Sequence, residues 1–126
     1  ESQLKALLQI TLSNRKAPRL PVRLEIFYGE GQRADYTASQ TFNVSVGGLF
    51  VESENPLRPD ELVQLRFSLP DREQPLCCQG RVAWINLPSS PINKSHPGGM
   101  GIEFVDFSEE RLLQTFLHSG SWKSER

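Results

Sequence analysis

Apolar and polar residues alternate with a period of two along much of the chain, which is the pattern of half-buried strands. The alternation is clearest in segments 22–28 and 63–69. Further extended segments are expected at 36–44, 49–51, 76–86 and 100–104. Five or six short antiparallel strands predict a small closed or nearly closed barrel, because closure removes exposed strand edges. The alternation by itself also fits a β-sandwich.

Helical spacing of apolar residues occurs near both ends of the chain. Leucines in the first dozen residues predict a short amphipathic helix that ends before Pro18. A second helix is expected after Ser108, a favourable N-cap, with Glu109 and Glu110 at the positive end of the helix dipole. Its apolar stripe consists of Leu112, Leu113, Phe116 and Leu117. The predicted fold class is therefore all-β with flanking helices.

The length of 126 residues fits one domain, and composition narrows the function. Lysine and arginine total 14 against 15 aspartate and glutamate, a formal net charge of −1, so no global field attracts DNA or RNA. Any anion site must be local. No apolar run is long enough to span a membrane, and the N-terminus lacks a signal-peptide layout. We therefore expect a cytoplasmic protein without direct membrane insertion.

Cysteines and histidines give no catalytic or metal-binding pattern. Cys77 and Cys78 are adjacent in a predicted strand, so their side chains should point to opposite faces as reduced structural thiols. In the same strand, Cys78 and Trp84 are expected on one face, together with the residues at even positions between them. His96 and His118 lack metal-ligand spacing. Without a P-loop or a nucleophile elbow, we expect no metal site and no enzyme.

The first candidate binding motif is the basic segment Arg15-Lys-Ala-Pro-Arg19, which leads into the first strand. Each guanidinium is a planar donor fork that suits phosphate oxygens or the acceptor edge of guanine, and each plane can stack on a base. Asn14 and Lys16 could add secondary contacts. Taken alone, the segment also fits a solvated basic linker.

The second candidate motif is Asn43-Val-Ser-Val-Gly-Gly48, where one strand ends and the next begins. Asn43 and Ser45 are expected on one face, with side chains that can hydrogen-bond a base or a ribose. Gly47 and Gly48 would permit positive φ angles and a close approach of the backbone to a ligand. Taken alone, this motif also fits an ordinary polar turn.

The two motifs in this order resemble the PilZ family, whose hallmark is an Arg-x-x-x-Arg loop followed by an Asp/Asn-x-Ser-x-x-Gly motif. The resemblance continues through residues 80–84 and 99–104. It implies a six-stranded antiparallel barrel with a C-terminal helix. The expected organisation is an N-terminal helix and connector over 1–14, a PilZ domain over 15–118 and a C-terminal tail over 119–126.

The resemblance further implies a receptor module that binds cyclic di-GMP on the outer surface of the barrel, with no other cofactor. The implied ligand contacts are Arg15, Arg19, Asn43, Ser45 and Gly48, with secondary contacts from Asn14, Lys16, Gly47 and Trp84. Asn14 stands where some relatives carry another arginine, a position that influences whether one or two ligand molecules bind. Both stoichiometries stay open.

Binding is expected to act on a protein partner or an upstream domain. The connector 13–21 contains few apolar residues, so a ligand could order it and reposition the preceding helix. One alternative is a degenerate PilZ-like adaptor that binds no nucleotide and acts through Phe50, Trp122 or the helices. Two further alternatives are a nucleotide hydrolase, for which no site assembles, and RNA or single-stranded DNA binding, which the charge balance disfavours.

Overall fold

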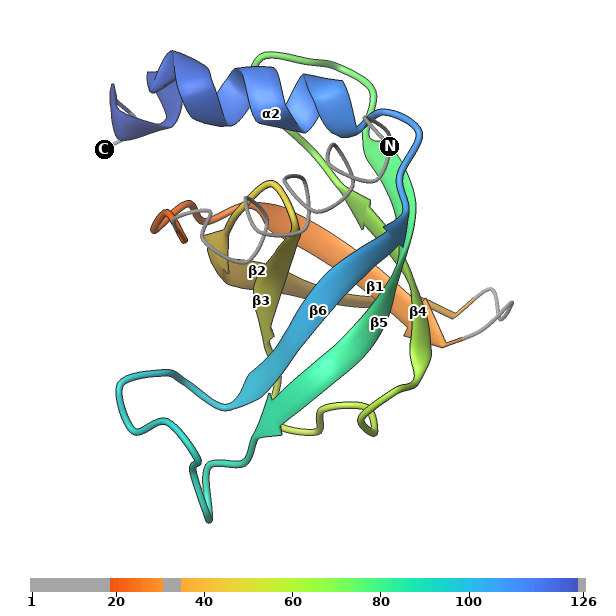
Figure 1. The fold of residues 1–126 in the computed structure, drawn as a ribbon, viewed down its shortest axis with the longest axis vertical. Helices are drawn as coiled ribbons and strands as arrows, with labels where there is room; N and C mark the ends of the chain where they lie inside the picture. Colours follow the sequence, from red (N-terminus) through yellow and green to blue (C-terminus); the bar gives the residue numbers. More distant parts are fainter. Residues whose placement is uncertain (1–18, 31–34, 125–126) are drawn as a thin grey trace, which may run out of the picture.

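The structure, a computed structural model, describes residues 19–30 and 35–124. Six antiparallel strands form a closed barrel in the order β1-β2-β3-β6-β5-β4, with one helix across an end (Figure 1). The strands are β1 (Glu25–Glu30), β2 (Thr37–Val44), β3 (Gly48–Glu52), β4 (Leu62–Phe67), β5 (Leu76–Asn86) and β6 (Gly99–Asp106). The predicted six-stranded antiparallel barrel is confirmed and the sandwich is excluded. The expected N-terminal helix lies outside the described residues.

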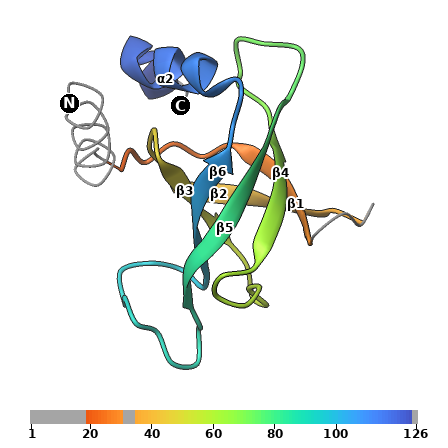
Figure 2. The same ribbon diagram turned by 45° about the vertical axis from the view of Figure 1, so that its right-hand side comes forward.

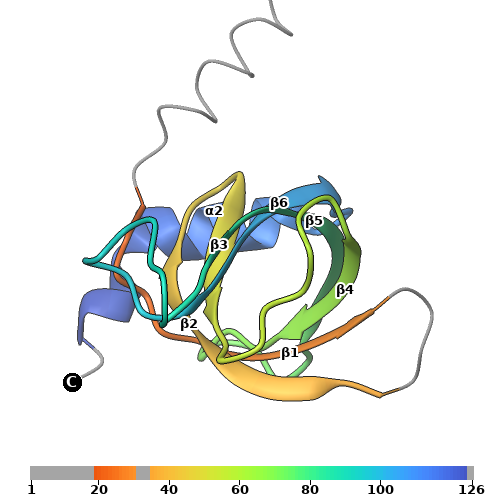
Figure 3. The ribbon, with the colours of Figure 1, turned by 90° about the horizontal axis from the view of Figure 1, so that it is seen from below.

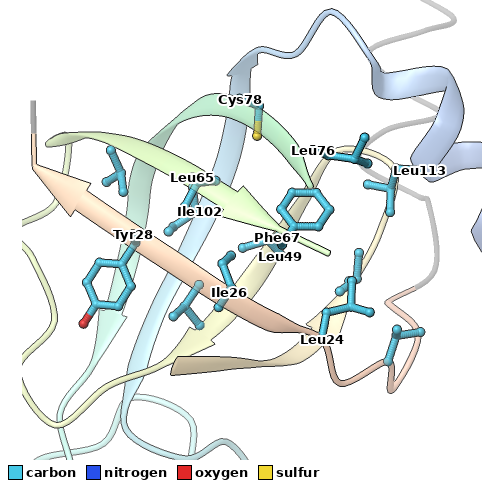
Figure 4. Close-up of a cluster of buried hydrophobic side chains, with 14 of the residues drawn as sticks. Leu24, Ile26, Tyr28, Leu49, Leu65, Phe67, Leu76, Cys78, Ile102 and Leu113 are labelled. Atoms are coloured by element: carbon cyan, nitrogen blue, oxygen red, sulfur yellow. The ribbon is translucent and has the colours of Figure 1, made fainter. Parts of the chain in front are cut away.

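The barrel closes because β1 pairs with both β2 and β4, as the view along its opening shows (Figure 3). Alternate apolar side chains then point inward. Leu24, Ile26 and Tyr28 are at most 6% exposed, as the alternation in segment 22–28 predicts. Their side chains converge with those of Leu65 and Phe67 in the interior (Figure 4).

A buried threonine ties the segment before β1 to β2. The hydroxyl of Thr41 accepts a hydrogen bond from the Leu24 amide at 2.8 Å and donates to the Val22 carbonyl at 2.7 Å. The Thr41 amide donates to the Leu24 carbonyl at 3.0 Å. These three hydrogen bonds pair the buried polar groups of Val22, Leu24 and Thr41 with one another. They fix the segment that follows the arginine motif against β2.

Helix α2 (Glu110–Ser119) covers the upper end of the barrel (Figure 2). Its buried residues Leu113, Phe116 and Leu117 belong to the barrel core, as the apolar stripe predicts. Gly120 ends the helix with a left-handed φ of 73°, and the 3-10 helix η1 (Ser121–Ser124) follows. Of the described helices, none has the length and apolar character needed to cross a membrane.

The predicted N-cap of α2 is wrong. Glu109, not Ser108, occupies the N-cap position, and its side chain makes no capping hydrogen bond. The backbone provides the reason, because the amide of Glu110 donates to the Phe107 carbonyl at 3.3 Å and so forms a turn through Ser108. This turn moves the helix start one residue beyond the predicted cap.

A β-bulge in β5 overturns the prediction that Trp84 shares a face with Cys78. Val82 pairs with Ile102, and Trp84, two residues later, pairs with Gly101, which is only one position away from Ile102 in the antiparallel strand β6. One extra residue on β5 therefore reverses the side-chain alternation. Val82 is fully buried in the core, whereas Trp84 contacts aromatic rings outside it.

The two adjacent thiols should differ sharply in reactivity. Cys77 is exposed and Cys78 is buried, and burial together with nearby Cys77 and Asp106 raises the pKa of Cys78 to about 12. Because the thiolate is the reactive form, iodoacetamide at about pH 8 should modify Cys77 but not Cys78 in the folded protein. Peptide mass spectrometry measures this. Both thiols should react after denaturation, and rapid labelling of native Cys78 would contradict the structure.

Candidate functional site

The two sequence motifs meet where the described chain enters the barrel. Leu20 pairs with Val44 at the end of β2 through two backbone hydrogen bonds of 2.9 and 3.0 Å. This pairing brings Arg19 beside Asn43, 24 positions further along the chain. The Nη1 of Arg19 donates a hydrogen bond to Asn43 Oδ1 at 3.3 Å. One residue of each motif therefore belongs to the same site.

Arg19 carries a positive charge that its described neighbours do not neutralise. Its polar partner there is the neutral amide of Asn43, whereas Arg23 forms an ion pair with Glu52 at 2.7 Å and Arg81 with Glu103 at 2.7 Å. Although Arg19 is exposed, partial removal from water lowers the pKa of its guanidinium. An anion bound beside Arg19 would offset the unfavourable desolvation of its charged guanidinium. Arg15, Asn14 and Lys16 lie outside the described residues.

Ser45 has a structural role in the turn between β2 and β3. Its side chain is only 3% exposed. The hydroxyl accepts a hydrogen bond from the Gly47 amide at 3.3 Å and donates to the Gly48 carbonyl at 3.3 Å. The Ser45 amide donates to the same carbonyl at 2.8 Å. These bonds shape the turn, and the contact of Ser45 with a ligand stays a prediction.

Glycine is required at position 48 because β6 passes very close. A Cβ atom on Gly48 would lie 2.1 Å from the carbonyl oxygen of Ile102. Next to it, the Gly47 carbonyl accepts a hydrogen bond from the Phe104 amide at 3.0 Å. Neither Gly47 nor Gly48 has a positive φ, so the predicted backbone conformation is wrong, and their close approach to a ligand stays a prediction. Close backbone packing against β6 explains Gly48 instead.

Four aromatic side chains gather outside the barrel core in what we call the ring cluster: Phe42, Phe50, Trp84 and His96. The His96 ring lies 4.9 Å from Phe42, 5.0 Å from Phe50 and 5.6 Å from Trp84. Sequence reasoning identified Trp84 but missed Phe42 and His96. Phe42 is the extra residue of a bulge in β2, and no signal in the local sequence reveals where the His96 loop folds.

A glycine in β6 makes room for the indole of this cluster. A Cβ atom on Gly101 would lie 2.2 Å from Nε1 of Trp84, so the indole packs directly over the β6 backbone. Gly101 pairs with Phe50 on one side and with Trp84 on the other. The centroids of these two rings are 5.3 Å apart. The bulge in β5 and the missing side chain in β6 together build this outer aromatic surface.

A shallow depression of about 270 Å³ connects the arginine motif to the ring cluster. It is lined by Arg19, Pro21, Arg23, Phe42 and Asn43. Phe42 belongs to both the depression and the ring cluster. This surface combines a cation, an amide and an aromatic ring, which are the groups that recognise a phosphorylated base.

A larger cavity, about 700 Å³, lies elsewhere and is a weaker candidate. Its lining includes the carboxylates of Glu52 and Glu54 but no residue of either motif. Such a surface disfavours an anionic ligand. Within residues 19–30 and 35–124, no cluster of three or more histidine, cysteine or acidic side chains could hold a metal ion.

Comparisons with solved structures support the fold. The chain is similar to the structure of the Bacillus subtilis inhibitor of motility (MotI/DgrA), with a TM-score of 0.67 and 18% identity over 89% of this chain and 53% of that one. It thus spans about half of that protein. It is also similar to the PilZ domain of CeSA from a cellulose-synthesizing bacterium, with a TM-score of 0.55 and 18% identity over 82% of this chain and 96% of that one.

At these identities the structural likeness shows the fold alone. No curated protein sequence matches the chain. The family model of the PilZ domain matches residues 13–119, a range that includes both motifs and every strand of the barrel. The chain therefore belongs to the PilZ domain family.

Proposed function

We propose that this chain is a receptor module that binds cyclic di-GMP on the outer surface of its barrel. The observation that carries the proposal is the hydrogen bond between Arg19 and Asn43, which joins the two family motifs in one site. The PilZ family binds cyclic di-GMP, whose phosphates and bases match the chemistry of the cation and the amide in this site. The same proposal includes ligand contacts from Arg15, Ser45, Gly47, Gly48 and Trp84.

The described groups suit a ligand with two phosphates and two flat guanines. The guanidinium of Arg19 can donate two parallel hydrogen bonds to phosphate oxygens or stack on a base. Asn43 uses its amide oxygen for Arg19, which leaves its NH₂ group to donate to an acceptor such as guanine O6 or N7. Asn43 would thus orient the arginine and read the base.

PilZ domains are in general receptor or adaptor domains without enzymatic activity. We propose the same for this chain, because the site offers hydrogen-bond donors and ring surfaces for holding a nucleotide. Its output would be a change in the connector 13–21. A ligand that pins this connector through both arginines would change how the preceding segment is presented to a protein partner or an upstream domain.

Calorimetry with cyclic di-GMP tests the proposed binding. Arg15→Ala and Arg19→Ala should each weaken binding by about 2 kcal/mol or more, because each removes a charge-assisted contact. Arg72→Ala is a matched control, since Arg72 is exposed and lies in neither motif. Cyclic di-AMP should bind more weakly because adenine lacks the O6 acceptor and the N1 and N2 donors of guanine.

Two results of this titration would contradict the proposal. If the wild-type chain bound no cyclic di-GMP, the adaptor interpretation would replace it. If cyclic di-AMP bound equally well, the proposed reading of guanine would be wrong.

Amide hydrogen exchange tests the proposed signal transmission. Cyclic di-GMP should slow exchange in residues 13–21 and 43–48 and alter protection in residues 4–12, because the ligand would join the two motifs. Strand β4 should keep its protection and is the internal control. Full protection of 13–21 without ligand, or a response confined to the strands, would rule out ordering of the connector as the mechanism.

Nucleotide affinity should depend on pH through His96. Removal from water and the nearby charge of Arg19 lower the pKa of His96. Bound phosphates would offset the Arg19 charge and raise that pKa, so binding takes up protons and tightens as pH falls through the range below about 6.5. Calorimetric titrations at about pH 8 and about pH 5.5 measure this change. His96→Phe should remove the dependence, whereas His118→Ala should leave it in place.

A further inference from the structure

Phe50 is buried although it does not face the barrel core. It pairs with Asn43 across β2 and β3, next to the core-facing pair of Val44 and Leu49. Its side chain is nevertheless only 1% exposed. An outward residue can be buried only if something covers it, and the other rings of the ring cluster surround Phe50.

The cover comes partly from the loop between β5 and β6, residues 87–98. His96 from this loop is the one member of the ring cluster that does not come from a strand, and its ring contacts the rings of all three strand residues. In Figures 1 and 3 the loop lies on the same side of the barrel as the first described residues. Through His96, the loop therefore contacts the Phe42 ring, which lines the depression beside Arg19.

A single buried side chain holds this loop in place. Asn86, 1% exposed at the end of β5, donates from Nδ2 to the carbonyls of Asn93, His96 and Pro97 at 3.0, 3.2 and 3.0 Å. Its Oδ1 accepts from the amides of Ile92 and Asn93 at 2.8 and 2.9 Å. The two N–H hydrogens are shared among the three carbonyls, so one side chain contacts five backbone groups of the loop, and the position of His96 depends on Asn86.

The ring cluster and the proposed nucleotide site are continuous. Phe42 lines the depression with Arg19 and Asn43, and Phe50 lies directly opposite Asn43 in the sheet. The charge of Arg19 also acts on His96 and lowers its pKa. A base that packed beside Arg19 would therefore meet rings whose arrangement depends on the loop.

We propose that Asn86 is a positioning residue for nucleotide binding: by fixing loop 87–98 it holds His96 against Phe42 and Phe50, so the ring cluster is already arranged to receive a guanine beside Arg19. This inference rests on the proposed binding of cyclic di-GMP. Binding gains affinity when side chains are ordered beforehand, because the ligand then does not have to order them. Asn86 acts through His96 and touches no ligand atom itself.

The test compares the full chain with His96→Ala and His96→Phe by calorimetry with cyclic di-GMP at about pH 7.5, where His96 is neutral. His96→Ala should weaken binding about tenfold, in line with the loss of aromatic pair contacts. His96→Phe keeps a ring against its neighbours and should stay within about twofold of the wild type. His118→Ala, on the exposed face of α2, is the matched control and should bind as the wild type does.

A double-mutant cycle tests whether Asn86 works through His96. Asn86→Ala should weaken binding about as much as His96→Ala, and the double variant should bind no more weakly than either single variant. Faster amide exchange in residues 87–98 should accompany Asn86→Ala. If Asn86→Ala fails to fold by circular dichroism, Asn86→Asp keeps the acceptor half of the contact and takes its place. If neither variant folds at room temperature, the same comparison is made at the lower temperature where Asn86→Asp folds, with the wild type and the His96 variants measured there too.

The outcomes separate this inference from the proposed function. No binding by the wild type would overturn both. Binding that Arg19→Ala weakens and His96→Ala leaves unchanged would overturn the positioning role alone. If His96→Phe were as weak as His96→Ala, the imidazole itself would be needed and positioning through ring packing would be wrong. Additive losses in the double variant would show that Asn86 does not act through His96.

Discussion

The pairing of Leu20 with Val44 is the contact on which the candidate site depends. Two backbone hydrogen bonds bring the start of the described chain against the end of β2, and the buried hydroxyl of Thr41 fastens the next residues to the same strand. Without this pairing, Arg19 would not lie within hydrogen-bond distance of Asn43. The barrel thus uses its own backbone to unite two motifs that are far apart in sequence.

Two β-bulges give the outer surface its aromatic character. A regular strand places successive side chains on opposite faces, so an aromatic residue in phase with the core would stay inside. The bulge in β2 adds Phe42 to the outer surface, and the bulge in β5 turns Trp84 away from the core. Gly101 between the strands leaves space for the indole. The same irregularities that interrupt the ladder therefore create a surface on which a base can stack.

Local charge, not net charge, makes this surface suitable for an anion. The chain as a whole is nearly neutral, with a formal net charge of −1. Arg23 and Arg81 form ion pairs with Glu52 and Glu103, whereas the described partner of Arg19 is an amide. The guanidinium of Arg19, which has no described carboxylate partner, therefore lies beside the amide of Asn43 and the ring of Phe42. This arrangement supports binding of a compact, doubly charged ligand better than binding of a long nucleic acid strand.

The sequence predicts the strand pattern, the apolar stripe of α2 and the two motifs, because these depend on local periodicity and on residue types with distinct chemistry. It could not determine which residues the bulges turn outward, since a bulge is defined by pairing with another strand. For that reason the sequence pattern places Trp84 on the wrong face and gives no sign of Phe42. The motif includes Gly48, but the reason that position 48 requires glycine is the carbonyl of Ile102, which lies on a strand distant in sequence. His96 joins the site only because Asn86 folds a loop back onto the barrel, and a contact between one side chain and five backbone groups leaves no periodic trace in the sequence.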